Sequence, residues 1–386
     1  MDVFEEMVLE IVSWLPAKSI CKFKSTCHSF SNFSKEILFK TKQSQNLFER
    51  GDTCFFIQPD QINQRYNKKV EFQSLPKHQQ YSGIPNHVLS FLSNSICVLD
   101  SSNGLLLCNI INNDPINIFI CNPITKSWFP IPIPESLQKN HKLANMNIML
   151  ECSLDDYKVF LFENTSDWFL ACYVCNVYYA KEGVWQTMEN NFLPGGRSMK
   201  FDMHVFHKGS LHFISDSGCY LSRSSSFYKP YIMSYNLDNG ISCMLKLPRQ
   251  ALKGCHMKCN MGIFNWGKVN SSYSSICLVK LRKCVITVWF LKDYDSSLWK
   301  KVLKVRVRAL GLTEKDPNVT GFTIMNGNLL VFSTEEKIYS CGLDDENFMM
   351  VEEICQHNCG FYTRFISYSD TLRSCGTNSE IMPVRN

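Results

Sequence analysis

The first forty residues carry apolar side chains at helical spacing. Between residues 4 and 15 they recur three, four and seven positions apart, which predicts a helix with one apolar face. Pro16 disfavours helical backbone at Leu15, so this helix ends there. A second short helix turns Ile20 and Phe23 inward. A third begins near residue 27 and carries Phe30, Phe33, Ile37 and Leu38 on one side. Three such helices cannot bury a sufficient core alone, so they predict a docking module.

Beyond residue 45 the pattern changes to short runs of β-branched and aromatic residues separated by Asn, Asp, Gly and Pro. Such runs predict a body made mainly of β-strands. The predicted strands are Cys54–Ile57, Ile96–Leu99, Leu105–Cys108, Asn117–Cys121, Val159–Phe162, Phe169–Tyr179, Ser210–Ile214, Ile232–Asn236, Ser275–Leu281, Cys284–Leu291, Leu303–Val307, Gly321–Met325, Leu329–Ser333 and Lys337–Cys341. Many short, evenly spaced strands suit a sandwich, a barrel or a propeller.

A weak repeat favours the propeller. A glycine turn followed by an apolar strand recurs at Gly104, Gly209 and Gly327, which are 105 and 118 residues apart. These intervals are about two units of a fifty-residue, four-stranded blade, so the body predicts six or seven blades. We expect the strand after each glycine to lie nearest the axis, and Trp or Tyr on outer strands to fill the wedge between blades. We also expect Cys54–Ile57 and a strand around Phe365–Leu372 to share one closing blade.

Composition and charge limit the classes of function. Aromatic residues make up 13% of the chain, which suits a β-rich body, and the net charge of +5 over 386 residues is too diffuse to imply nucleic acid. From Leu15 to Lys42 six lysines stand against Glu36 alone, which favours an acidic partner for the helices. The N-terminus opens with acids and spaced apolar residues, unlike a signal peptide, and no apolar run is long enough to span a bilayer. We therefore expect no membrane and a cytoplasmic or nuclear location.

The nineteen cysteines predict reduced thiols and no metal site. Cys172 and Cys175 lie at an odd separation on a predicted strand, so their thiols point to opposite faces. The segments Cys255-His256-x-x-Cys259 and Cys355-x-His357-x-Cys359 would supply four zinc ligands if the fold joined them. They are about a hundred residues apart, and buried small hydrophobic side chains are the favoured interpretation.

No catalytic motif stands out in the sequence. The chain lacks G-x-S-x-G, a phosphate loop, H-E-x-x-H and G-x-G-x-x-G. Asp155-Asp156 and 344–346 are interpreted as solvated turns, and Gly195-Gly196-Arg197 as a plain turn. Lys304, Arg306 and Arg308 alternate with valines, which predicts a strand with one basic, solvent-facing side. We expect a protein that is not an enzyme and has no cofactor.

The order of residues in the helical module resembles the F-box motif of plant F-box proteins. The matching pieces are Ile11-Val-Ser-x-Leu15-Pro16-x-Lys18-Ser19, Phe23 and Cys27-x-Ser29-Phe30. Val3-Phe4 stands where the family usually has Leu-Pro, and Phe30 where it usually has Trp. The resemblance implies binding to a Skp-type adaptor and through it to a cullin. The implied adaptor-binding residues are Ile11, Leu15, Pro16, Lys18, Ser19, Ile20 and Phe23, with Leu15, Pro16 and Ile20 central and Ile11 beneath.

The body resembles the kelch-like F-box-associated domain of the same plant proteins. The matching pieces are Ser102-Asn103-Gly104-Leu105-Leu106, Asn122-Pro123-x-Thr125, Gly209-x-Leu211-His212, Tyr235-x-Leu237-Asp238 and Tyr368-Ser-Asp-Thr371-Leu372. The implied organisation is an F-box at 1–44, a kelch-like β-propeller at 45–372 and a flexible tail at 373–386. The implied function is the substrate-recognition subunit of a ubiquitin ligase, with a protein substrate on the propeller. The alternative is a ligand-binding or enzymatic kelch-type propeller outside ubiquitination.

Overall fold

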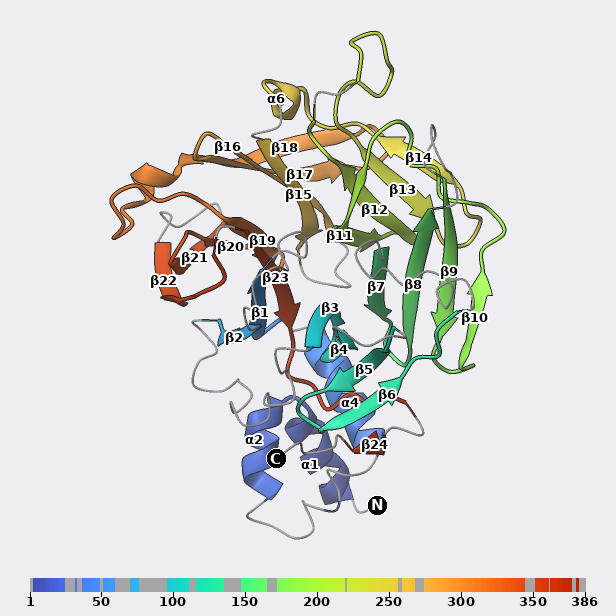
Figure 1. Cartoon of the computed structure of the whole chain (residues 1–386). Helices are drawn as coiled ribbons and strands as arrows, with labels where there is room; N and C mark the ends of the chain where they lie inside the picture. The colour runs from blue at the N-terminus through green and yellow to red at the C-terminus, as the bar shows by residue number, and fades with distance from the viewer. Residues whose placement is uncertain are drawn as a thin grey trace. The chain divides into compact units, whose positions relative to one another are not determined.

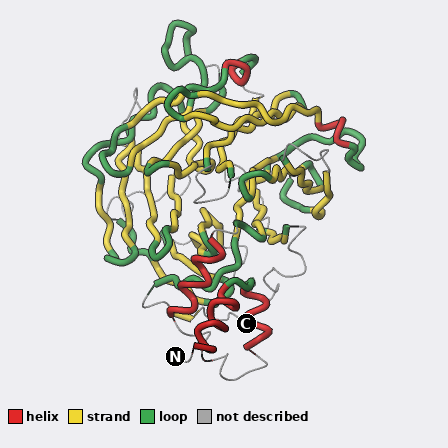
Figure 2. The backbone as a smooth tube through the Cα atoms, turned by 180° about the vertical axis from the view of Figure 1, so that it is seen from behind, coloured by secondary structure: helices red, strands yellow, loops and turns green. Residues whose placement is uncertain are grey.

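The computed structural model describes residues 3–24, 32, 37–48, 51–59, 70–75, 96–110, 116–134, 147–164, 172–218, 221–255, 259–267, 274–343, 351–360, 362–376 and 380–381. Helices gather in the N-terminal module, and strands make up most of the rest (Figure 2). The module contains α1 (Val3–Ser13), α2 (Ala17–Lys24) and α4 (Ile37–Phe48). Phe30 and Phe33, predicted on the third helix, lie outside the described residues.

Polar contacts join the two longer helices of the module. α1 ends just before Pro16, as predicted, and Ser13 Oγ donates a hydrogen bond to Glu10 O (2.7 Å). Asn46 of α4 donates from Nδ2 to Ser13 Oγ (2.7 Å), and Lys42 forms an ion pair with Glu10. Ser13, the last residue of α1, is thus held by a side chain of α4.

The chain forms two units, the first comprising residues 1–159, 178–185 and 362–386. Two sheets lie in this unit: β2-β1-β23 and β24-β6-β5-β4-β3 (Figure 1). Their strands are β1 (Cys54–Pro59), β2 (Glu71–Ser74), β3 (Ile96–Ser102), β4 (Leu105–Ile110), β5 (Ile118–Asn122), β6 (Ser127–Pro130), β23 (Thr363–Tyr368) and β24 (Glu380–Ile381). A third sheet, β10-β9-β8-β7, has strands in both units: β7 (Asn147–Cys152), β8 (Tyr157–Asn164), β9 (Tyr173–Tyr179) and β10 (Val184–Thr187).

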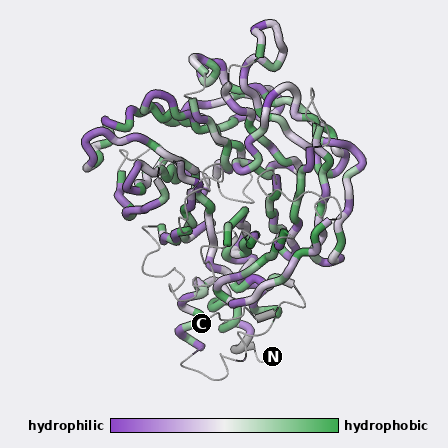
Figure 3. The backbone as a smooth tube through the Cα atoms, viewed as in Figure 1, coloured by the Kyte–Doolittle hydropathy of each residue, from purple (hydrophilic) through white to green (hydrophobic). Residues whose placement is uncertain are grey.

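The second unit, 160–177 and 186–361, holds three sheets whose strands follow one another in chain order. Their strands are β11 (Met199–His207), β12 (Ser210–Ser215), β13 (Ile232–Asn236), β14 (Ser242–Leu245), β15 (Cys259–Trp266), β16 (Ser275–Arg282), β17 (Val285–Asp293), β18 (Leu298–Arg306), β19 (Gly321–Met325), β20 (Leu329–Ser333), β21 (Lys337–Gly342) and β22 (Val351–Gln356). Two short helices, α6 (Arg249–Leu252) and η5 (Val307–Leu310), connect them. Hydrophobic residues concentrate on the strands (Figure 3).

Six antiparallel sheets, mostly four-stranded and joined strand to neighbouring strand, are the blades of a β-propeller. The predicted fold class is therefore confirmed, with six blades among the described residues. The predicted closing blade is also confirmed, because β1 pairs antiparallel with β23 from Cys54↔Tyr368 to Pro59↔Thr363. Strands more than 300 residues apart in the sequence thus share one sheet.

The glycine turns occur where the repeat predicted them, but their role differs from the prediction. Gly104, Gly209 and Gly327 each join the first and second strands of a blade. The strand that follows each glycine has neighbours on both sides, whereas the strand nearest an axis must be an edge strand. The prediction that this strand lies nearest the axis is therefore wrong.

Tryptophans on fourth strands link successive blades, as predicted. Trp185 of β10 donates from Nε1 to Pro132 O (2.6 Å), just after β6 of the preceding blade. Trp299 of β18 donates from Nε1 to Lys246 O (3.0 Å), just after β14. Both bonds span 53 residues. This interval of 53 residues is therefore a clearer measure of the length of one blade than the spacing of the glycines.

The segment 369–375 is a buried connector, in contrast to the predicted flexible tail from residue 373. Asn122 donates from Nδ2 to Thr371 O (3.0 Å) and Arg373 O (2.7 Å). Arg373 donates from Nη2 to Asp156 O (2.7 Å), and Cys375 is fully buried. The prediction of a flexible tail is therefore wrong for residues 373–376. Polar side chains of neighbouring blades form hydrogen bonds with the backbone of this segment, and the composition of the segment does not reveal those partners.

The helical module packs on this connector. Ala17, Ile20, Phe39 and Leu372 form one buried cluster, with Ile124 of the propeller packed against it. Gln43 is fully buried; its Nε2 donates to Leu15 O (3.3 Å) and its Oε1 accepts from Leu372 N (2.8 Å). The F-box-like helices are thus part of the first unit and share its core.

Two isoleucines allow a matched test of this packing. Ile20 is 0% exposed and Ile11 is 65% exposed. Ile20→Ala removes buried methyl groups and leaves a cavity, so we expect it to lower the free energy of unfolding by about 2–5 kcal/mol. Ile11→Ala should change it by less than about 0.5 kcal/mol. Urea denaturation of both variants provides the measurement, and equal stabilities would contradict the packing.

Truncations test the closing blade. A chain without residues 361–386 lacks β23, so β1 gains an open edge that favours aggregation. We expect this protein to elute as aggregates in size-exclusion chromatography. Among the described residues, a control without residues 377–386 loses the two-residue pairing of β24 with β6, and it should remain monomeric with nearly unchanged Tm. A monomeric protein of normal Tm after the longer deletion would refute the role of β23.

Candidate protein-docking surface

The helical module has more apolar side chains than its core uses. Each helix turns some of them inward, such as Ile20 and Phe39, and leaves others in solvent. The exposed ones are between 49% and 76% accessible: Met7, Ile11, Phe23, Ile37 and Leu38. Side chains of this size cost free energy when left in water, so a group of them on one small module is a candidate interaction site.

The structure divides the predicted adaptor-binding residues into three groups. Ile11 and Phe23 are exposed, so the prediction that Phe23 turns inward is wrong. Four are half-buried: Leu15, Pro16, Lys18 and Ser19. Ile20, predicted at the centre of the interface, is completely buried against Phe39 and Leu372, so the interpretation of this residue as a contact is wrong. The physical reason is that Ile20 shares a helix face with Ala17, three positions earlier, and that face covers the connector.

Three exposed residues of this surface were not predicted as site residues. Met7, Ile37 and Leu38 were recognised as apolar positions on helices, but periodicity alone cannot distinguish the face that packs inward from one that a partner covers. The sequence does contain one indication of these residues, because the module has more apolar positions than its own core can bury.

Basic residues accompany the apolar surface. Lys22 and Lys24 occupy the last turn of α2, where positive charge also favours the helix C-terminus. The pKa of Lys40 is lowered by partial burial and by the charge of Lys24, so the two amines are close. An acidic partner would relieve this repulsion, in line with the charge bias of the sequence.

The charge of Lys18 also acts on a buried carboxyl group within the chain. Asp370 of the connector is fully buried and accepts a hydrogen bond from Thr53 Oγ1 (2.6 Å). Burial raises the pKa of Asp370 to about 6, while the bond from Thr53 and the charge of Lys18 oppose that rise. Lys18 therefore helps to stabilise a buried carboxylate beneath the module.

The histidine and cysteine clusters serve internal hydrogen bonds. His357 is buried; its Nδ1 accepts from Cys359 N (3.2 Å), so its Nε2 donates to Thr334 O (3.0 Å). Cys255 Sγ donates to Ala251 O (3.1 Å) and accepts from Lys280 Nζ (3.7 Å). His256 lies outside the described residues. Within the residues that the structure describes, no three His, Cys, Asp or Glu side chains are grouped to hold a metal ion.

The remaining chemical candidates are structural as well. His212 Nε2 lies 2.7 Å from Tyr294 Oη, and burial followed by the charge of His207 lowers the pKa of His212 to about 4. Arg197 is buried and paired with Asp216 (3.0 Å), which agrees with a plain turn. Arg308 belongs to η5 and pairs with Asp316, so it is not part of the predicted basic strand. In the described part of the chain, no helix has the length and apolar character needed to cross a bilayer.

Comparison with known proteins gives the same two regions. A model of the F-box domain matches residues 2–42, and a model of the F-box associated beta propeller domain matches residues 53–356. F-box protein At5g49610 of Arabidopsis thaliana is 20% identical over 329 residues, which cover 79% of each chain. F-box protein At5g18160 of the same plant is 30% identical over 132 residues, covering 34% of this chain and 32% of that protein.

Among solved structures, TolB from Acinetobacter baumannii aligns with a TM-score of 0.48 and 13% identity, covering 82% of this chain and 66% of that one. The kelch-like character expected from the sequence stays a prediction. The two matched models follow the order of helices and sheets along the chain and cover most of it. The chain therefore belongs to the F-box proteins that carry an F-box associated beta propeller domain.

Proposed function

We propose that this protein is the substrate-recognition subunit of a Skp–cullin–F-box ubiquitin ligase. The observation that supports this most strongly is the exposed apolar set on the helical module, formed by Met7, Ile11, Phe23, Ile37 and Leu38. These residues would bind a Skp-type adaptor and thereby a cullin. The propeller would bind a protein substrate, and the protein would act in the cytoplasm or nucleus.

The proposed mechanism is positioning without catalysis by this chain. A ligase that holds a substrate beside the charged ubiquitin-conjugating enzyme raises the effective concentration of the attacking lysine. Positioning requires that the adaptor-binding helices do not swing freely relative to the domain that holds the substrate. The contacts of Gln43 and Leu372 meet this requirement within the first unit, because they tie the helices to the connector and the first blades.

Exposed side chains provide the cleanest test of adaptor binding. We expect Ile11→Ala with Phe23→Ala to weaken binding to a purified Skp-type adaptor by about 2 kcal/mol or more, roughly thirtyfold, because apolar anchors dominate such interfaces. Ile11 is 65% exposed and Phe23 is 49% exposed, and neither belongs to the buried cluster of the module, so Tm should change little. Isothermal titration calorimetry measures the affinity and differential scanning fluorimetry the stability.

A matched control is available on the propeller. Leu154 is 46% exposed in the turn between β7 and β8, so Leu154→Ala removes a similar exposed apolar side chain from the propeller and none from the helices. It should bind the adaptor as the unaltered protein does. Normal adaptor affinity of the Ile11 and Phe23 double variant would contradict the proposed docking surface, and absence of binding by the unaltered protein would contradict the proposed function.

A further inference from the structure

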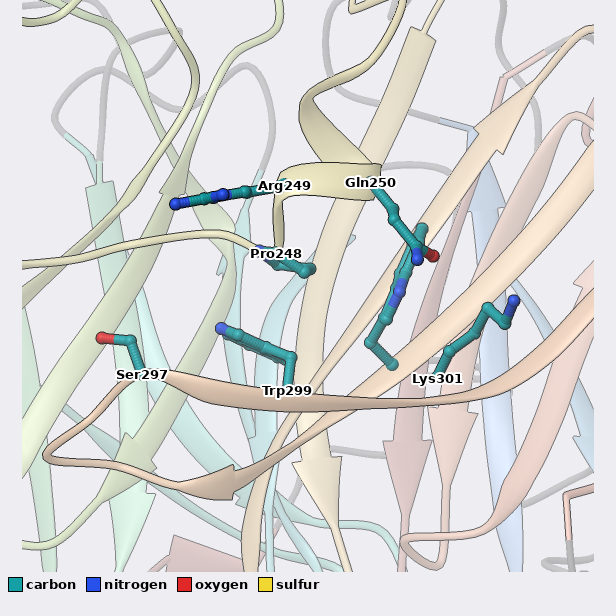
Figure 4. A pocket seen from close by; sticks show the side chains of 7 residues that line it. Pro248, Arg249, Gln250, Ser297, Trp299 and Lys301 are labelled. Carbon is teal, nitrogen blue, oxygen red and sulfur yellow. The ribbon is translucent and has the colours of Figure 1, made fainter.

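The second unit carries a pocket with an aromatic floor and a basic rim. Its volume is about 310 Å³. Pro248, Arg249 and Gln250 line one side at the start of α6, and Trp289, Trp299 and Lys301 line the other from β17 and β18 (Figure 4). The size is at the lower end for ligand sites in proteins and suits one or two side chains of a bound peptide.

The floor of the pocket is rigid because its indoles have structural partners. Trp289 is buried in the cluster that includes Leu245 and Ala251. Trp299 is only half-buried, and its Nε1 donates to Lys246 O (3.0 Å). The ring of Trp299 is therefore fixed between two blades while part of it stays accessible. Such a preformed aromatic surface binds apolar side chains at little cost in conformational entropy.

The β-sheet register places the positive charge beside these rings. Lys301 pairs with Trp289, and Trp299 pairs with Leu291, so Trp299 and Lys301 lie two residues apart on the same side of β18. On the opposite side, buried Ala251 anchors α6, and Arg249 is exposed at its first position. Two cations, one on α6 and one on β18, thus line the same pocket as the two tryptophans.

No carboxylate neutralises this charge within the described residues. The pocket lining contains no Asp or Glu, and neither Arg249 nor Lys301 forms an ion pair or hydrogen bond there. Two other cations of the same unit do have a carboxylate partner, since Arg308 pairs with Asp316 and Lys337 with Glu353 (2.9 Å). The pocket therefore has positive charge available for a ligand.

We propose that this pocket binds an acidic segment of a protein substrate, with an apolar or aromatic side chain against Trp299 and carboxylates at Arg249 and Lys301. Charge complementarity selects the acidic partner, and the aromatic floor selects a segment that also carries an apolar anchor. A nucleic acid would need a longer basic track than two cations provide. The inference rests on the proposed function, since it assigns the substrate class of a ligase subunit.

Fluorescence anisotropy on the full chain tests the pocket. The probe is a fluorescein-labelled peptide with three glutamates on each side of one tryptophan. We expect it to bind in the micromolar range, and binding should weaken as salt rises. A peptide with lysine in place of every glutamate, a peptide with glycine in place of tryptophan, and a single-stranded oligothymidine serve as comparison probes and should bind at least about tenfold more weakly.

Charge-reversed variants locate the binding. Arg249→Glu with Lys301→Glu should weaken the acidic peptide by at least about tenfold at unchanged Tm, because both side chains are exposed. The control Lys304→Glu with Arg223→Glu makes the same change in net charge at exposed positions outside the lining and should retain the affinity. Equal weakening by both pairs, no binding of the acidic peptide, or tighter binding of the oligothymidine would overturn the proposal.

The measurements distinguish a failure of the pocket proposal from a failure of the ligase proposal. Adaptor affinity of the Arg249 and Lys301 variant should be normal, because these residues lie far along the chain from the helices. A protein that binds the adaptor but not the acidic peptide would refute the pocket alone. A protein that binds the peptide at the pocket but not the adaptor would refute the ligase role and leave a peptide-binding propeller.

Discussion

The hydrogen bonds of the buried segment 369–375 are the constraint on which the first unit depends. This stretch follows β23, and its backbone groups have partners on several elements: Gln43 binds Leu372 N, Asn122 binds two carbonyls, and Tyr157 Oη donates to Cys375 O (2.8 Å). Irregular backbone can be buried only when its polar groups are satisfied in this way. Gly104 belongs to the same arrangement, since an added Cβ would lie 2.0 Å from Thr371 Oγ1. The helices, the closing blade and its neighbours therefore fold as one structure.

This constraint explains why an F-box module of short helices is stable in this chain. Its own core is too small, and Leu372 and Ile124 complete it from the propeller side. Because the propeller completes the core on one side of the module only, the apolar side chains on the other sides of the helices remain exposed. The same geometry that stabilises the helices thus leaves Ile11 and Phe23 exposed, so the proposed docking residues lie outside the core that holds the module in place.

The sequence predicted the interior strands of the blades better than the edge strands. The second and third strands, such as β12 and β20, are buried on both faces and appear as continuous apolar runs. Edge strands such as β10 and β22 alternate with exposed polar residues and were not predicted. The module was predicted from periodicity, and so was the inward position of Ile20, but the sequence did not reveal what Ile20 packs against. Its burial depends on Leu372, a contact across more than 300 residues that no local pattern encodes.

The pocket between β18 and α6 illustrates how a repeat fold acquires a specific site. Trp185 and Trp299 make the same hydrogen bond to the preceding blade, so the tryptophan on the fourth strand is a structural device of the repeat. Near Trp299, Arg249 at the start of α6 and Lys301 two residues along β18 line a pocket together with the ring. The same tryptophan thus links two blades and forms part of the pocket. Because its hydrogen bond is made to a backbone carbonyl, the link between the blades does not depend on which side chains line the pocket.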